Sequence, residues 1–142
     1  MQALVLIDLD DFKVINDTHG HGCGDEVLRR IGRALGGCVR PGDLAVRHGG
    51  DEFAVLLQDP GLTVAAAHER ARELREVVHA QPWHELAPGL GVTVSLGVAV
   101  AAPRVGVAEA PADDAGRLYA AADQALYTAK RDRSGLHVAA AS

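Results

Sequence analysis

The stretch Asp43–Leu57, DLAVRHGGDEFAVLL, holds two short apolar runs that are separated by two glycines and two acids. Aliphatic residues dominate both runs, so the sequence predicts strands over Leu44–His48 and Phe53–Leu57. The segment between them, Gly49–Glu52, begins with a double glycine, which suits a hairpin turn with positive φ angles. The stretch therefore predicts a β-hairpin that carries two carboxylates at its turn.

Apolar patterns predict the remaining elements. The run Ala3–Asp8 (ALVLID) is typical of a strand buried on both faces, and the alternating run Val92–Val100 (VTVSLGVAV) predicts another strand. Helical spacing is expected over 10–17, 25–36, 63–80 and 115–131, with loops over the glycine-rich 18–25, over 81–91 and over 101–116. The order β-α-α-β-β-α-β-α predicts one α+β domain over 1–138, with 139–142 as a tail. A central sheet carries the hairpin, and helices pack over it.

Composition excludes several classes of partner and site. The 142 residues are 48% hydrophobic with a net charge of -5, and no Lys/Arg-rich stripe that would bind nucleic acid is present. No apolar stretch approaches membrane-spanning length, and no signal peptide opens the chain. The two cysteines, Cys23 and Cys38, have no zinc-site spacing. We expect a cytoplasmic protein without a nucleic-acid or membrane partner.

Two acidic clusters stand where strands end. Asp8, Asp10 and Asp11 leave the first strand, while Asp51 and Glu52 occupy the hairpin turn. If the first strand neighbours the hairpin, Asp8 and Asp51 converge at one sheet edge, where their charges repel unless a cation lies between them. Carboxylates combined with nucleotide phosphates are typical of Mg²⁺ sites, and displacement at phosphorus commonly uses two ions about 3.5–4 Å apart. The alternative is that both clusters are solvated strand ends and turn residues.

Four ordered motifs resemble one known family. They are RHGGDEF at 47–53, DLDDFKVINDTHGHGCGDEVL at 8–28, VTVSLGVAV at 92–100 and ADQALYTAK at 122–130. Together they resemble the GGDEF family of bacterial signalling enzymes, the diguanylate cyclases, whose fold is similar to nucleotidyl cyclase and polymerase palm domains. The resemblance implies that two GTP molecules are joined into cyclic di-GMP, with release of pyrophosphate, where two protomers of a homodimer face each other.

The resemblance also implies a metal site. Asp8, Asp51 and the backbone carbonyl of Leu9 are expected to bind Mg²⁺, or Mn²⁺ in its place, with two ions per active site. Glu52 is expected either as a further ligand or as the group that helps to deprotonate the ribose 3′-hydroxyl. Gly49 and Gly50 carry no side chains, so the backbone of the turn can approach the nucleotide.

Further positions of the family's motifs are expected to bind the substrate. Asn16 and Asp25 match the guanine-binding positions, and a carboxylate such as Asp25 can accept from the adjacent N1–H and N2–H donors of guanine. The alternatives are a turn residue at Asn16 and a helix cap at Asp25. His21 matches a position near the nucleotide. Lys13 and Lys130 match phosphate-binding lysines of the family, and Lys13 is also expected to be a catalytic residue.

A second site is expected just before the hairpin. The tetrad RPGD, with Arg40 and Asp43, fits the family's Arg-x-x-Asp motif, through which cyclic di-GMP inhibits its own synthesis. Arginine can form a bidentate contact to phosphate or guanine, and aspartate can accept from a guanine edge. A helix arginine usually completes such a site, and Arg72 and Arg75 are the two candidates.

The sequence departs from the family pattern at both ends. The chain starts after the position of the family's helical segment with the pattern D-x-L-T-G-L-x-N-R, so we expect its stability and activity to suffer. The family's late phosphate-binding arginine has two loose matches, Arg131 and Arg133. The main alternative function is a catalytically silent module that senses GTP or cyclic di-GMP. An adenylate cyclase or polymerase is a third interpretation, disfavoured by Asp25 and by the lack of a basic surface.

Overall fold

The structure is a computed structural model that describes residues 1–101 and 111–140. The described residues form five strands and five helices. In chain order these are β1 (Gln2–Leu9), α1 (Phe12–His19), α2 (His21–Cys38), β2 (Leu44–Gly49), β3 (Glu52–Gln58), α3 (Val64–His79), α4 (Trp83–Leu86), β4 (Val94–Ala101), α5 (Pro111–Arg131) and β5 (Leu136–Ala140). Every helix within these residues is too short or too polar to cross a lipid bilayer.

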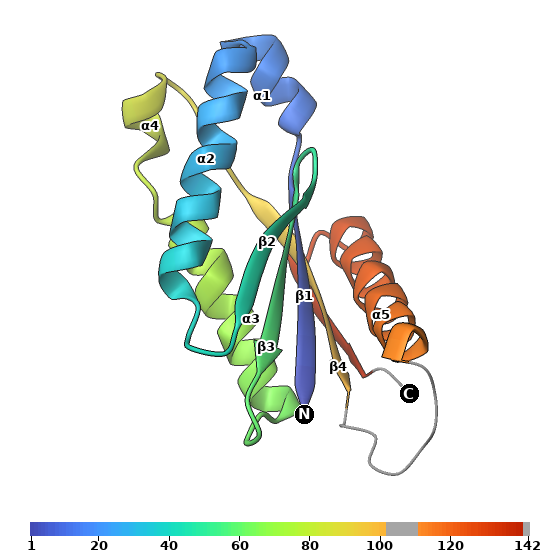
Figure 1. Cartoon of the computed structure of the whole chain (residues 1–142). Helices are drawn as coiled ribbons and strands as arrows, with labels where there is room; N and C mark the ends of the chain where they lie inside the picture. The colour runs from blue at the N-terminus through green and yellow to red at the C-terminus, as the bar shows by residue number, and fades with distance from the viewer. Residues whose placement is uncertain (102–110, 141–142) are drawn as a thin grey trace.

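One mixed sheet organises the domain, with strand order β2-β3-β1-β4-β5. The central strand β1 runs antiparallel to both β3 and β4, β2 and β3 form the predicted hairpin, and β5 joins the far edge parallel to β4. At the end of β1, Asp8 lies opposite Glu52 of β3 and opposite Ser95 of β4. The hairpin turn therefore stands beside the point where the chain leaves β1 for α1 (Figure 1). The predicted α+β fold is confirmed.

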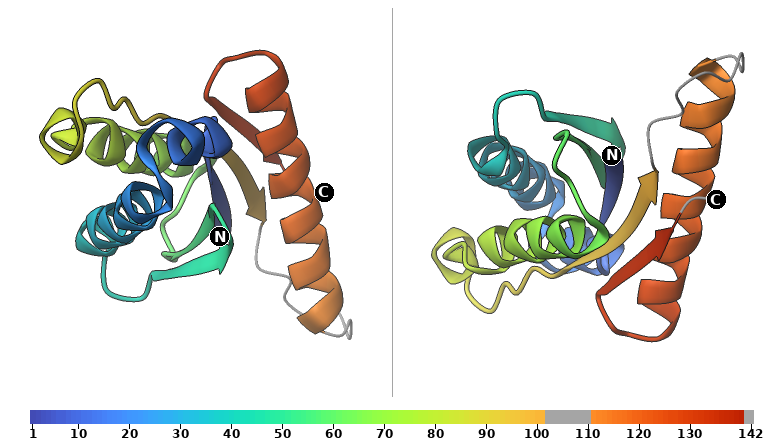
Figure 2. Two further views of the ribbon diagram at one scale, coloured as in Figure 1. Left: turned by 90° about the horizontal axis from the view of Figure 1, so that it is seen from above. Right: turned by 90° about the horizontal axis from the view of Figure 1, so that it is seen from below.

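Helices cover the two faces of the sheet unequally. Helices α2 and α3 lie on one side and α5 on the other, as Figure 2 shows from above and below. The larger core forms under α2 and α3, where the predicted apolar face of β4 is confirmed by the buried Val94, Leu96, Val98 and Val100. On the opposite face, α5 approaches β4 so closely that a Cβ at Gly97 would lie 2.2 Å from the backbone nitrogen of Leu126.

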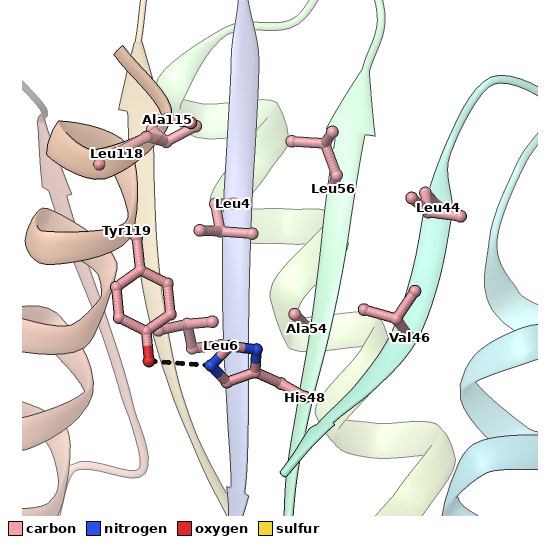
Figure 3. Close-up of a pocket in the computed structure, with 11 residues that line it drawn as sticks. Leu4, Leu6, Leu44, Val46, His48, Ala54, Leu56, Ala115, Leu118 and Tyr119 are labelled. Carbon is pink, nitrogen blue, oxygen red and sulfur yellow. Dashed lines mark hydrogen bonds between the residues drawn. The ribbon is translucent and has the colours of Figure 1, made fainter. Parts of the chain in front are cut away.

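Next to α5 this second face keeps an apolar pocket of about 480 Å³. The hydroxyl of Tyr119 on α5 lies 3.1 Å from His48 Nε2 at one end of the pocket (Figure 3). Leu44 and Val46 of the edge strand β2 remain 56% and 45% exposed. The sheet side of the pocket is lined by Leu4, Leu6, Leu44, Val46, Ala54 and Leu56. A single helix thus buries only part of this face.

Several predicted boundaries were wrong. The glycine-rich segment expected as a loop is mostly helical, since α2 begins at His21 and Gly20 alone separates it from α1. Gly20 has φ 92°, a conformation that glycine adopts at little cost, so one residue is enough to turn the chain.

Two elements were not predicted. The loop expected over 81–91 contains the short helix α4, whose Trp83 is buried and donates its indole N–H to the carbonyl of Val78. Strand β5 includes residues 139 and 140, which the sequence assigned to a tail. Of the loop expected over 101–116, residues 102–110 lie outside the described residues, and 111–116 belong to α5.

Candidate active site

Three carboxylates converge at the end of β1. The sheet register pairs Asp8 with Glu52, and the Leu9 backbone N–H donates to the carbonyl oxygen of Asp51 at 3.2 Å. Side chains of a strand alternate between faces, so Asp8 points to the side of the sheet that α5 covers. From α5, Lys130 reaches back and places its Nζ atom 2.5 Å from Asp8 Oδ2. The structure thus brings together the residues predicted to form the metal site.

Two carboxylate oxygens of this cluster have no hydrogen-bond partner in the described part of the chain. Among the described residues, Asp8 Oδ1 and Glu52 Oε1 are buried without a hydrogen bond. Burial raises the pKa of Asp8; Lys130 opposes this effect and Asp51 adds to it. Burial likewise raises the pKa of Glu52, where His48 opposes the shift and the neighbouring carboxylates reinforce it. A buried carboxylate without a donor is costly unless a cation or a proton compensates it.

The donor set fits a hard cation that keeps other ligands. Within the described residues, no three His, Cys, Asp or Glu side chains are arranged to hold a metal ion by themselves. Mg²⁺ is commonly bound through one or two carboxylates together with water and substrate phosphates. The unpartnered oxygen of Asp8, the adjacent Asp51 and the backbone near Leu9 match that requirement. Lys130 supplies a positive charge at Asp8 in this structure.

Arg47 holds the hairpin turn. Its guanidinium donates to the carbonyl oxygen of Gly50 from Nη2 at 2.5 Å and to that of Gly49 from Nε at 3.3 Å. The prediction of positive φ at the double glycine was wrong, because the described glycines with positive φ lie elsewhere. A Cβ at Gly49 or Gly50 would meet nothing within 4 Å, so packing inside the chain does not require glycine there. The expectation that they admit a nucleotide stays a prediction.

The residues expected to bind guanine lie on the α1–α2 pair. Asn16 of α1 has a buried Oδ1 atom without a partner among the described residues, and a Cβ at Gly24 would lie only 1.9 Å from that atom. Gly24 therefore permits the close approach of the two helices at Asn16. Asp25 follows on the exposed side of α2, in its second turn. Because α2 begins at His21, the helix-cap role considered for Asp25 was wrong.

The remaining predicted substrate residues are solvent-exposed. Lys13 lies in the first turn of α1, and His21 is the first residue of α2. Of the two candidate arginines after α5, Arg131 pairs with Asp132 at 3.2 Å, and Arg133 has a left-handed φ of 55°. Neither observation identifies a phosphate ligand, so the choice between Arg131 and Arg133 stays open.

Asp43, of the predicted inhibitory site, accepts hydrogen bonds on both of its carboxylate oxygens. Its Oδ2 atom accepts from the Arg40 backbone N–H at 3.0 Å and from Arg70 Nη2 at 2.8 Å, and its Oδ1 atom accepts from the Gln58 N–H at 3.2 Å. Burial pushes its pKa upward, but the bond from Arg70 and the two N–H donors outweigh that effect and hold the pKa below its usual range. The Arg40 side chain stays exposed.

The helix arginine beside Asp43 is Arg70, and neither candidate named from the sequence, Arg72 or Arg75, is the one that pairs with it. Arg72 pairs instead with Glu69 and Glu76 on its own helix. The guanidinium of Arg75 packs under Gly135, where a Cβ would lie 2.4 Å from it. Arg70 shares the buried stripe of α3 with Ala67, Ala71 and Leu74. A charged residue at helical spacing on an apolar stripe was the signal that could have identified it.

Comparison with known proteins agrees with this geometry. Residues 1–135 match the family model described as "Diguanylate cyclase, GGDEF domain". Diguanylate cyclase DgcS of Shewanella oneidensis is 36% identical over 128 residues, and response regulator PleD of Caulobacter vibrioides is 42% identical over 131 residues. Each match covers 90% of this chain but only 38% and 27%, respectively, of the relative.

Solved structures show the same fold. The GGDEF domain of YfiN (TpbB) from Pseudomonas aeruginosa is 35% identical with a TM-score of 0.78, covering 97% of this chain and 81% of that one. The GGDEF domain of DgcB from Caulobacter crescentus, solved in complex with c-di-GMP, is 32% identical with a TM-score of 0.72, covering 99% and 77%. Because the family model matches residues 1–135 of the 142, the chain belongs to the GGDEF family of diguanylate cyclase domains.

Proposed function

We propose that this chain is a diguanylate cyclase domain that condenses two GTP molecules into cyclic di-GMP and releases two pyrophosphates. The observation that carries the proposal is the convergence of Asp8, Asp51 and Glu52 at the end of β1, where two buried carboxylate oxygens have no hydrogen bond within the described residues. A bound cation would compensate these oxygens, whose burial without a donor is costly. Membership of the GGDEF family supports the same proposal.

In the proposed reaction, Asp8, Asp51 and the Leu9 carbonyl would hold Mg²⁺ or Mn²⁺, two ions per site, and the ions would supply positive charge at the phosphate under attack. The 3′-oxygen of one GTP forms a bond to the α-phosphorus of the other, and the bond from that phosphorus to pyrophosphate breaks. The reciprocal step then closes the ring and releases the second pyrophosphate. Glu52, whose pKa is raised mainly by burial, is suited to accept the 3′-hydroxyl proton.

We assign substrate recognition to residues of α1 and α2, together with Lys130 of α5. Asn16 and Asp25 contact guanine, with Asp25 accepting from N1–H and N2–H, and His21 lies beside the nucleotide. Lys13 and Lys130 bind phosphate oxygens. The contact between Lys130 and Asp8 supports this assignment, because it places a flexible cation where a triphosphate meets the carboxylates. Adenine leaves Asp25 unsatisfied, which costs roughly 1–3 kcal/mol.

We assign product inhibition to Arg40, Asp43 and Arg70. Asp43 already accepts three hydrogen bonds, so the exposed Arg40 side chain is the group free to reach a phosphate or guanine. Each domain holds one GTP, so two copies must face each other for the reaction to occur. Dimerisation therefore limits activity at low protein concentration.

The test is incubation of concentrated protein with GTP and Mg²⁺, with cyclic di-GMP measured by mass spectrometry. Asp51→Asn is the matched variant, because it removes one charge of the cluster and preserves side-chain shape. Product from the wild type alone, abolished by EDTA, supports the proposal. GTP or cyclic di-GMP binding without product at any protein concentration supports the alternative, a silent sensing module, and contradicts the cyclase function.

A further inference from the structure

The turn that leaves β1 is fastened from the side opposite the hairpin. The Asp10 carboxylate accepts from Thr93 Oγ1 at 2.8 Å on Oδ2 and from Ser95 Oγ at 2.7 Å on Oδ1. The Asp10 backbone N–H also donates to the carbonyl oxygen of Thr93 at 3.0 Å. Three bonds therefore tie Asp10 to Thr93, just before β4, and to Ser95 on β4, and both carboxylate oxygens take part.

These bonds set the direction of the preceding carbonyl. The Leu9–Asp10 peptide is trans, so the Leu9 C=O points away from the Asp10 N–H across one plane. Since that N–H points to Thr93, the residue just before β4, the Leu9 carbonyl points to the hairpin side, where the Leu9 N–H already bonds to the carbonyl of Asp51. The contact of Asp10 with β4 therefore aims the Leu9 carbonyl at the carboxylate cluster.

The surroundings keep this arrangement rigid. Asp11, the next residue, has a left-handed φ of 53° without being glycine, a conformation that costs about 1 kcal/mol or more and persists only where neighbouring contacts impose it. Ser95 is 4% exposed, so its hydroxyl is shielded from competing water. The imidazole of His79 on α3 accepts the Val94 N–H at 3.0 Å and anchors the same end of β4.

We propose that Asp10, held by Thr93 and Ser95, is a positioning residue that orients the Leu9 carbonyl as a ligand for the divalent cation. This inference rests on the proposed function, since it concerns the metal site of the cyclase reaction. The Asp10 carboxylate accepts from the Thr93 and Ser95 hydroxyls on the side away from the hairpin, so the proposed role acts through Leu9 and not through direct coordination. Residues that orient metal ligands commonly change metal affinity by about 10–100-fold when they are replaced.

The test measures how strongly Mg²⁺ improves nucleotide binding without any reaction. The probe is a GTP analogue with a methylene group between the α- and β-phosphorus atoms, titrated by calorimetry in Mg²⁺ and in EDTA. The ratio of the two dissociation constants reports the contribution of the metal. We expect Asp10→Ala to reduce this ratio about tenfold and to leave binding in EDTA unchanged. Asp10→Asn should keep most of the ratio, because its amide can accept from one hydroxyl and donate to the other.

Two further variants protect the test against a simple loss of stability. Thr93→Val removes a single hydroxyl with little change of shape and should lower the ratio by a smaller factor than Asp10→Ala. Thr63→Ala removes the side chain that caps α3, which costs stability away from the turn and should leave the ratio unchanged. A folded Asp10→Ala with the wild-type ratio overturns the positioning role, as does an Asp10→Asn as weak as Asp10→Ala.

The outcomes separate this inference from the proposed function. A wild-type chain that binds the analogue more tightly in Mg²⁺ but forms no cyclic di-GMP contradicts the cyclase activity, while the variants still decide the role of Asp10. A wild-type chain whose nucleotide binding does not respond to Mg²⁺ overturns both.

Discussion

At the turn end of the β2–β3 hairpin, Asp8 and Glu52 each keep a buried carboxylate oxygen without a hydrogen bond among the described residues. At the open end of the same hairpin, Asp43 accepts three hydrogen bonds, one of them from the buried Arg70. The pKa shifts follow this difference, since those of Asp8 and Glu52 are raised, chiefly by burial, and that of Asp43 is held low against burial by its donors. Acidic residues near the two ends of one hairpin thus have pKa values shifted in opposite directions.

The difference separates two uses of a carboxylate. A carboxylate whose oxygens both accept hydrogen bonds has its charge compensated within the chain, so removing it is costly for stability. Neighbouring carboxylates with oxygens that accept no hydrogen bond repel one another, so they lower stability when no ligand is bound. We therefore expect substitutions at the two ends to affect different measurements.

The largest effect is expected for Asp51→Asn at the turn end. Loss of this proposed metal ligand should reduce cyclic di-GMP formation by at least about a hundredfold, the range seen when a group that stabilises transition-state charge is lost. The free energy of unfolding should stay level or rise, because the variant removes a charge that repels Asp8. Turnover and urea denaturation, measured on the same preparation, check both parts. A large loss of stability in this variant would contradict the comparison.

The next effect is expected at the open end, for Asp43→Ala. Arg70, whose side chain is 7% exposed, would lose its shortest ion pair and keep only the longer contact with the exposed Glu73 at 3.9 Å and the one with the Cys38 carbonyl at 3.5 Å. Removing one partner of a buried ion pair typically costs about 3–5 kcal/mol. Urea denaturation should therefore show a large decrease in the free energy of unfolding, in contrast to Asp51→Asn. An Asp43→Ala variant as stable as the wild type would show that the ion pair with Arg70 contributes nothing to the fold.

The hydrogen bonds to Asp43 should make the free energy of unfolding depend on pH. The folded-state pKa of Asp43 lies below the ordinary value of 3.8, so the unfolded chain binds this proton more readily than the folded chain. The stabilisation is complete above the unfolded value and is lost as the pH falls through the folded pKa. Unfolding free energies of the wild type and Asp43→Asn should therefore differ near neutral pH and converge as the pH falls below 3.8. A constant difference would rule out this source of stability.

The fold and the proximity of the acidic residues at the turn end could be predicted from the sequence, because both depend on local patterns. The apolar run of β1 ends at Asp8, the hairpin turn presents Asp51, and antiparallel pairing of the two strands then places them together. The start of α2 was missed, because glycine-rich segments are ordinarily loops and only packing against α1 makes Gly24 favourable in a helix. Strand β5 depends on a parallel partner far along the chain, which local patterns cannot reveal.

The arginine beside Asp43 was missed for a related reason. Arg70, Arg72 and Arg75 all lie on α3, and only the position of α3 against the loop before β2 decides which one reaches the carboxylate. The neighbours differ in consequence. Arg70 is buried, whereas Arg72 is 46% exposed and pairs with two glutamates in solvent.

The smallest effect is therefore expected for Arg72→Ala, although Arg72 and Arg70 each take part in two ion pairs. Exposed pairs gain little, because water screens their charges and the side chains lose freedom on pairing. Denaturation of Arg72→Ala should match the wild type within error, while Arg70→Ala should resemble Asp43→Ala. Combining Arg70→Ala with Asp43→Ala should cost less than the sum of the two, since both remove one interaction. Full additivity would mean that the two residues stabilise the chain independently, and the contrast between the hairpin ends would then lose its physical basis.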